Sequence, residues 1–331
     1  MNGHRVNRRA FLGAAGFALA APMIASPRLA FAQAYPSRPV RVIIPFTPGG
    51  APDVLLRLVA QKLSEKWGQG VVVENRAGGN TLTGTVAAIK SPPDGYTLLM
   101  TADQTFILNP LLYASLPYSM KELDPIILVA SIPHMLAVSH KVPVSNVKEL
   151  IALAKQKPDT LTYGTTGPGT IQRIATEYFA GIAGIKLVHV PYRGANETTT
   201  AILSGEIDMT INGMSNILPH IEGGKLKALA ISTLTRHRLA PDIPTMQEAG
   251  VTGYSSQGAF GLFAPAGMPA EIRAKINADT AEILKRPDVV KTLEDRSFQV
   301  DNVGPEGFAK MIASETEKWA KVIRAANIKG D

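Results

Sequence analysis

Two stretches of this chain share one layout, and the repetition constrains the fold more than any other feature. Residues 40–53, VRVIIPFTPGGAPD, predict a strand that runs into a glycine- and proline-rich turn. Residues 161–170, LTYGTTGPGT, predict the same arrangement. A helical stretch and a second apolar strand, at 71–75 and 186–192, follow each of them. Two β-loop-α-β units, one early and one in mid-chain, therefore predict two α/β lobes.

Each unit should expose the N-terminus of a helix at its glycine-rich turn. Such a terminus carries unpaired N–H groups and a partial positive charge, so it attracts anions. Two of them facing each other across a cleft would hold a small molecule that bears a carboxylate. The Pro-Gly-Gly segment at 48–50 is also compatible with a simple tight turn, and the second copy is what favours binding.

The first 32 residues have the pattern of a secretory signal peptide. Arg5, Arg8 and Arg9 precede an uncharged stretch, and Ala30-Phe31-Ala32 supplies the small residues of a cleavage site. The double arginine resembles a twin-arginine export signal but also occurs in ordinary secretory signals. An uncleaved membrane anchor is the alternative. Cleavage would leave 299 of the 331 residues as a periplasmic protein.

Composition excludes several classes of function. The chain has no cysteine, so disulfides, thiolate metal sites and a lipid anchor are ruled out. Its formal charge of +7 includes four arginines of the signal, and without them 30 basic and 27 acidic residues leave +3. No basic run marks a nucleic-acid site. The histidines are scattered, and neither a metal-binding motif nor a dinucleotide or serine-hydrolase motif is present, so we expect no cofactor and no metal.

Strands and helices alternate along the chain, which predicts an α/β fold with largely parallel sheets. We expect helix 53–67 to be capped by Asp53, two apolar strands around Pro133 within 126–139, and helices from Pro269 almost to the end. The pattern breaks near 130 and returns near 257. Residues 33–132 plus 258–331 should therefore form one lobe and residues 133–257 the other, joined by two hinge crossings.

The same segments resemble the periplasmic solute-binding proteins of tripartite tricarboxylate transporters, the Bug or TctC-like family. The matching stretches are YPSRPVRVIIPFTPGGAPD, VVVENRAGG, PPDGYTLLM, LTYGTTGPGT, HVPYRG, LSGEIDM and LPHIEGGKLKALAIST. They occur in family order over nearly the whole chain after the signal. The resemblance implies a two-lobed Venus-flytrap protein, each lobe a mostly parallel sheet flanked by helices, with the ligand cleft between the lobes.

The family's ligands are small carboxylates, including di- and tricarboxylates, acidic amino acids and aromatic acids. They are held mainly by backbone N–H groups, hydroxyls and waters. The resemblance implies a receptor that serves a membrane permease of this transporter type or a sensor ectodomain, and we expect a monomer. By position in the motifs, the implied ligand-binding residues are Pro48, Gly49, Gly50, Asp53, Thr101, Ala102, Asp103, Thr165, Thr166, Gly169, Thr170, Tyr192, Arg193, Asp208, Asn212 and Gly213.

Three residues depart from the family pattern. Arg173 stands where the family usually has histidine after the second loop, and Thr165 stands where serine is usual. Asp103 occupies a loop in which small neutral residues are common. If Asp103 faces the cleft, it disfavours a second bare carboxylate nearby and favours an amine or hydroxyl of the ligand.

Several site residues also have a structural interpretation. Arg193 is equally compatible with a ligand carboxylate and with the surface, and Tyr192 with stacking on an aromatic ligand and with packing. Asp208 enters a strand, where it either faces the cleft or braces the lobe. Asp53 serves as a helix cap even if it also orients a bridging water.

A binding receptor is the function that these features favour, with no catalytic residue assigned. The rival is an exported α/β enzyme acting on a small organic acid, which would need an acid–base group or nucleophile in the cleft. Asp53, Asp103 and Asp208 are the candidates for such a group. An adhesive or structural protein has little support, because nothing in the chain is repetitive.

Overall fold

The structure is a computed structural model that describes residues 1, 3 and 35–329. The predicted signal peptide and its cleavage site thus lie almost entirely outside the described residues. From Tyr35 onward the elements are β1 (Val40–Ile44), α1 (Ala51–Trp67), β2 (Val71–Asn75), α2 (Leu82–Ile89), β3 (Thr97–Ala102), the π-helix η1 (Gln104–Leu108), α3 (Asn109–Leu112), the 3₁₀-helix η2 (Met120–Glu122), β4 (Leu123–Ser139), α4 (Val147–Gln156), β5 (Thr162–Thr165), α5 (Ile171–Ala183), β6 (Val188–Pro191), α6 (Ala195–Ser204), β7 (Met209–Gly213), α7 (Met214–Glu222), β8 (Leu226–Ile231), β9 (Gln257–Pro265), α8 (Ala270–Ile283), α9 (Pro287–Glu294), β10 (Gln299–Val303) and α10 (Pro305–Ala325).

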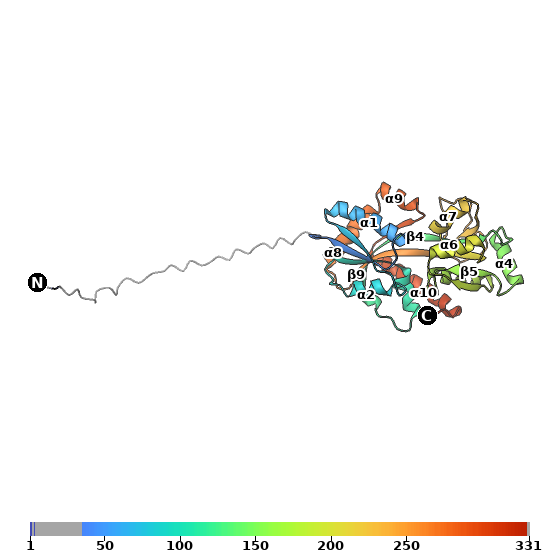
Figure 1. The fold of residues 1–331 in the computed structure, drawn as a ribbon, viewed down its shortest axis with the longest axis horizontal. Coiled ribbons are helices and arrows are strands. Elements are labelled where there is room, and N and C mark those ends of the chain that lie inside the picture. The colour runs from blue at the N-terminus through green and yellow to red at the C-terminus, as the bar shows by residue number, and fades with distance from the viewer. Residues whose placement is uncertain (2, 4–34, 330–331) are drawn as a thin grey trace. The chain divides into compact units, whose positions relative to one another are not determined.

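The strands form a mixed sheet in the order β2-β1-β3-β9-β4-β7-β5-β6, with β8 and β10 also paired to β4. The ladders among β1, β2 and β3 are parallel, and so are those among β5, β6 and β7. Strands β4 and β9 run between these two sets in opposite directions, so they pair antiparallel with each other and with their neighbours. The predicted α/β class is confirmed, with these two antiparallel strands at its centre (Figure 1).

Strand β4 is a single strand of 17 residues. Its first part, up to Pro133, pairs with β9, and from His134 onward it pairs with β7 and β8. Pro133 lies where β4 changes partners, and proline cannot donate a ladder hydrogen bond. Because β4 nevertheless continues through Pro133, the prediction of two separate strands around this residue is wrong.

Apolar side chains pack on both faces of the sheet because alternate residues of a strand point to opposite sides. In β1, Val42 and Ile44 join the core under α1 and α8, whereas Ile43 joins the core under α10. In β4, Leu136 packs toward α4 and α5, whereas Met135 packs toward α6 and α7. Each parallel set is thus covered by helices on two faces (Figure 1).

The sequence predicts helices from Pro269 almost to the end of the chain, but the C-terminal region is not helical throughout. Strand β10 interrupts it between α9 and α10 and pairs with β4, with Gln299 opposite Ser131. The sequence QVDNV is short, polar and half-buried, so it carries neither the apolar run nor the alternation that would mark a strand.

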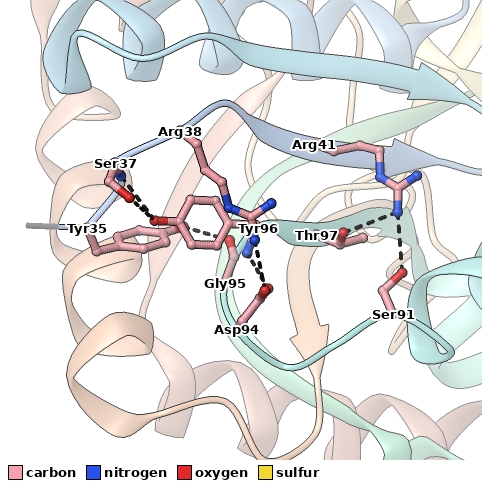
Figure 2. A network of polar contacts seen from close by, with 9 residues as sticks. All are labelled: Tyr35, Ser37, Arg38, Arg41, Ser91, Asp94, Gly95, Tyr96 and Thr97. Atoms are coloured by element: carbon pink, nitrogen blue, oxygen red, sulfur yellow. Dashed lines mark hydrogen bonds and ion pairs between the residues drawn. The ribbon is translucent and has the colours of Figure 1, made fainter. Parts of the chain in front are cut away.

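The chain segment that follows the predicted signal is held against the turn that precedes β3 (Figure 2). The Tyr35 hydroxyl donates a hydrogen bond to the carbonyl oxygen of Gly95 at 2.7 Å. Arg38 pairs with Asp94 at 3.1 Å and lies 4.0 Å above the Tyr96 ring. The described body therefore begins in a well-bonded position at Tyr35.

Candidate ligand-binding site

Four helices begin at a cavity of about 720 Å³, each directly after a strand. They are α1 after β1, α5 after β5, α6 after β6 and α7 after β7, and η1 after β3 joins them. In open α/β sheets ligands bind at the carboxyl ends of the strands. The lining residues are Phe46, Thr47, Pro48, Gly49, Gly50, Ala51, Pro52, Ala102, Asp103, Gln104, Ile132, His134, Thr166, Thr170, Ile171, Gln172, Arg193, Gly194, Ala195, Asn196, Glu197, Asn212, Gly213, Ser215, Asn216, Gly258 and Phe260.

The N-termini of these four helices present backbone donors. Among the described residues, no side chain caps α1, α5, α6 or α7 through a hydrogen bond. The first-turn N–H groups of an uncapped helix seek an acceptor, and the helix dipole favours a negatively charged one. A cavity surrounded by such ends is suited to an anion.

The first loop is shaped by Asp53, which lies behind it and does not line the cavity. Its carboxylate accepts hydrogen bonds from the N–H of Gly49 at 2.9 Å, from Arg57 at 2.9 Å and from Asn75 at 2.8 Å. Burial raises the pKa of Asp53, but these bonds outweigh it and hold the pKa below its ordinary value. The N-cap of α1 is Gly50, so the prediction of Asp53 as the cap is wrong.

The second loop is held from behind by Thr165. Its hydroxyl lies 2.7 Å from Nε2 of His189 and donates to the carbonyl oxygen of Gly167 at 3.1 Å. Thr166 and Thr170 line the cavity. The Thr170 hydroxyl donates to the same Gly167 oxygen at 2.9 Å, so it folds the loop and leaves the first turn of α5 uncapped.

Arg173 lies beneath this loop rather than in the cavity. It donates to the carbonyl oxygen of Pro168 at 3.3 Å. Burial, with a further effect from the Arg173 charge, lowers the pKa of His189 to about 4, so this imidazole is neutral near pH 7. Arg173, singled out as unusual in the sequence, thus supports the loop and does not line the cavity.

Asn212 supplies a side-chain donor without a partner. The residue is 1% exposed and lines the cavity. Its Oδ1 accepts from the N–H of Gly213 at 2.7 Å, which leaves Nδ2 as a buried donor with no partner among the described residues. Buried polar groups are nearly always hydrogen-bonded, so this amide can donate to an acceptor placed in the cavity.

Asp103 brings a carboxylate to the same cavity. It is 4% exposed and accepts a hydrogen bond from the N–H of Ala259 at 3.3 Å. Burial raises its pKa to about 7, while the backbone N–H groups of Ala259 and Gln104 act in the opposite direction. The Asp103 side chain also lines a second cavity of about 300 Å³, on the side of α10.

The structure places ten of the sixteen predicted site residues on the cavity wall: Pro48, Gly49, Gly50, Ala102, Asp103, Thr166, Thr170, Arg193, Asn212 and Gly213. The other six lie off the wall. Besides Asp53 and Thr165, they are Thr101, Gly169, Tyr192 and Asp208.

These four residues have structural partners of their own. Thr101 lies 2.5 Å from the hydroxyl of Thr105, and Tyr192 donates to Glu206 at 2.8 Å. Asp208 accepts from the N–H and the hydroxyl of Thr162 at 2.8 and 2.9 Å, which ties β7 to β5. Gly169 lies close to Asn80 and lines a neighbouring cavity with it.

Among the lining residues that sequence reasoning missed, two groups are informative. Gln172, Glu197 and Asn216 lie in the first turns of α5, α6 and α7, and a fixed offset from each loop would have found them. His134 and Gly258 lie on β4 and β9, where an apolar strand pattern gives no sign of a cavity. The His134 Nδ1 lies 2.6 Å from the Ser256 hydroxyl, and burial lowers the pKa of its imidazole to about 4.

No group of three or more metal-ligating side chains occurs within residues 35–329. None of the helices in that range is both long and apolar enough for a membrane span.

Two parallel strand sets joined by two crossing strands, with helix N-termini around a cavity at the strand ends, define a two-lobed solute-binding fold. The solved structures agree with this class. "R. palustris Rpa4515 with adipate" has a TM-score of 0.82 and 32% identity, covering 89% of this chain and 99% of that one. MatC from Rhodopseudomonas palustris with bound malate has a TM-score of 0.78 and 27% identity, covering 87% and 100%.

A sequence model of the tripartite tricarboxylate transporter family receptor, TctC, matches residues 55–328. This chain therefore belongs to the tripartite tricarboxylate transporter receptor family. Protein BugT of Bordetella pertussis (strain Tohama I) is 32% identical over 326 residues, which are 98% of this chain and 99% of that protein. The resemblance predicted from the motifs is confirmed, and the family is one of solute-binding receptors rather than enzymes.

Proposed function

We propose that this protein is a periplasmic receptor that captures a small organic carboxylate in the cavity and delivers it to a tripartite tricarboxylate transporter permease. A sensor ectodomain is the alternative recipient. One observation supports the carboxylate above all: the buried Nδ2 donor of Asn212 opens into a cavity surrounded by uncapped helix N-termini. Donors held in place, with no side-chain cation needed, suit a ligand that brings its own negative charge.

The relatives support the same ligand class. One structural neighbour carries adipate and another malate, and both are small dicarboxylates. A cavity of about 720 Å³ has room for a molecule of that size or for a larger acid.

Capture would involve closure of two lobes, residues 33–132 plus 258–331 and residues 133–257. The change of strand partners at Pro133 of β4, opposite Gln257 of β9, supports hinges at these crossings. A ligand that contacts both lobes favours the closed form by the free energy of those contacts. We propose that a single chain is sufficient, so the protein acts as a monomer.

Not every predicted site residue would touch the ligand. The ten on the cavity wall are proposed as contacts. Asp53 and Thr165 would instead hold the two glycine-rich loops before α1 and α5 in position, and Asp208 would hold β7 against β5.

A thermal-shift screen of carboxylic acids on the purified protein tests this function. A true ligand at 100 times its Kd should add about 2.7 kcal/mol of stability. Calorimetry should then give one ligand per chain, small-angle scattering should show compaction, and the bound acid should be recovered unchanged. Binding without compaction would argue against closure, and consumption of the acid would favour an enzyme.

The periplasmic location has a separate test. Residues 1–32 are proposed to be cleaved on export, and Arg8 and Arg9 to direct the twin-arginine route. Fractionation of cells that express the full chain should recover the shortened form in the periplasm. Replacing both arginines by lysine should block recovery if the route is correct, whereas unchanged export would indicate an ordinary secretory signal.

A further inference from the structure

Asp103 differs in chemistry from the donor-rich surface around it. The helix N-termini and the Asn212 amide offer hydrogen-bond donors to the cavity, whereas a carboxylate offers acceptors. Asp103 lies just beyond the last residue of β3, and its side chain is almost completely buried. A buried carboxylate in an anion-binding cavity needs a compensating group, because an unpaired buried charge is costly.

The protein itself does not neutralise Asp103. Within residues 35–329, the carboxylate forms no ion pair, and its partners are the backbone N–H groups of Ala259 and Gln104. On the α10 side, Lys318 is engaged by Glu315 at 3.2 Å and lies above the Trp319 ring.

The other groups that border the same cavity do not compensate it either. His134 carries a neutral imidazole near pH 7, whose Nδ1 faces Ser256. Arg193 and Glu197 also border the cavity, where the Glu197 carboxylate accepts a hydrogen bond from the backbone N–H of Arg193 at 3.0 Å, and within residues 35–329 neither side chain forms a hydrogen bond or ion pair with Asp103. Asp103 therefore borders the cavity without a cationic side-chain partner among the described residues.

The sheet order places Asp103 and Asn212 on opposite sides of the cavity floor. The floor is made by β9 and β4, which contribute Gly258, Phe260 and Ile132 to the lining. Asp103 follows β3 on one side of this floor, and Asn212 lies in β7 on the other. Three strand spacings, roughly 14 Å between backbones, separate them. One small molecule can thus meet an acceptor at one end and a donor at the other.

On the basis of the proposed function, we infer that Asp103 is a specificity residue. It selects an acid that carries, in addition to its carboxylate, a hydrogen-bond donor such as a protonated amine or a hydroxyl. Such a donor pairs with Asp103 while the carboxylate faces Asn212 and the helix N-termini. An acid whose other end is apolar or a second bare carboxylate leaves Asp103 uncompensated or repels it. Amino and hydroxy acids should therefore bind more tightly than their unsubstituted parents.

Calorimetry on matched acids tests this selection in the wild-type protein. The series is succinate, malate and aspartate, then adipate with 2-hydroxyadipate and 2-aminoadipate, and butyrate with its 4-hydroxy and 4-amino forms. At the chain length that binds best, the substituted acid should bind at least tenfold more tightly than its parent, as expected for a hydrogen bond to a charged group. Equal affinities at every length would overturn the inference and leave the proposed carboxylate receptor intact.

Amino acids and hydroxy acids should differ in the number of protons released when they bind. An ammonium that pairs with Asp103 keeps the carboxylate ionised, so binding near pH 6 should release a proton, measured as a buffer-dependent heat. A hydroxyl donor should release little.

The variant Asp103→Asn removes the charge and keeps the size of the side chain. It should reduce the preference for the substituted acid to threefold or less while the parent acid binds at least as well. Asp242→Asn, a change at an exposed position, is the matched control and should leave the preference unchanged. A tenfold preference that survives in Asp103→Asn would overturn the inference. If no acid in any series binds the wild type, the proposed function itself fails, which is a different result from loss of preference.

Discussion

At the scale of single residues, Asn212 joins two roles in one amide. Its Oδ1 secures the N–H of Gly213 at the start of α7, and its Nδ2 remains available to the cavity. The variant Asn212→Asp keeps the shape and the first bond but replaces the donor by a charged acceptor. Carboxylate binding should fall by at least tenfold, through the lost bond and the added repulsion.

Calorimetry with the best acid of the thermal-shift screen measures this loss. Asn146→Asp is a suitable control, because Asn146 caps α4 away from the cavity and aspartate caps equally well. Unchanged affinity in Asn212→Asp would mean that the ligand does not use this amide.

The stability of the ligand-free protein should depend on pH through Asp103. Burial raises its pKa to about 7, above the value of about 4 in an unfolded chain. The folded state therefore binds more protons between these values, and this group's contribution to stability falls as pH rises from about 4 to about 7. His134 and His189 act with the opposite sign, because their lowered pKa values of about 4 cost stability as pH falls below about 6.5.

Comparing Asp103→Asn with wild type isolates the first effect, since both proteins keep the histidines. In urea denaturation, the stability of the variant relative to wild type should be greater at pH 7.5 than at pH 5. A stability difference that is constant with pH would show that the pKa of Asp103 is not raised in the folded protein.

At the scale of an element, the glycine-rich loop before α1 depends on the backbone conformation of Gly49. Gly49 has φ of +82°, a region that costs a residue with a side chain about 1–2 kcal/mol, whereas Gly50 has φ of −73°. Gly49→Ala should therefore destabilise the protein by that amount and weaken ligand binding. Gly50→Ala, next to it in the chain, keeps an ordinary φ and should cost less, about 0.5 kcal/mol, because alanine is a poorer N-cap than glycine. Chemical denaturation of both variants checks the contrast, and equal losses would contradict it.

The glycine-rich loops before α1 and α5 could be predicted because the sequence patterns that mark them are local. A strand pattern followed by glycine and proline locates the turn without knowledge of distant contacts. The start of α1 was misplaced by two residues, because Pro52 fits the first turn and moves Asp53 inside the helix, from where it reaches back to Gly49. Strand β10 and the continuity of β4 through Pro133 depend on partners far away in the sequence, so no local pattern predicts them.

The candidate site shows the same division. The strand-end residues Asp103, Thr166 and Asn212 could be located from loop positions and motif matches. Thr101 and Ala102 are adjacent, yet only Ala102 lines the cavity, because successive side chains of a strand point to opposite faces. The contributions of His134 and Gly258 require that β4 and β9 lie side by side, which is a property of the assembled sheet.

At the scale of the whole molecule, α10 links segments that are far apart in sequence. Its Trp319 is buried against Tyr178 of α5, with ring centroids 5.7 Å apart, and it lines the second cavity behind Asp103. The other tryptophan, Trp67 of α1, donates a hydrogen bond to Asp279 of α8 at 2.7 Å. Under the proposed lobe boundaries, Trp319 faces a residue of the opposite lobe and Trp67 has partners in its own lobe.

If the proposed closure occurs, the two tryptophans would allow it to be followed by intrinsic fluorescence. Because the chain has only two tryptophans, saturating ligand should change the emission through Trp319 and leave Trp67 as a constant reference. Trp67→Phe should retain the ligand-dependent change and Trp319→Phe should lose it, in a fluorescence titration. The reverse assignment would place the moving contact elsewhere. Ligand arrival and release could then be timed by stopped-flow emission in the unlabelled protein.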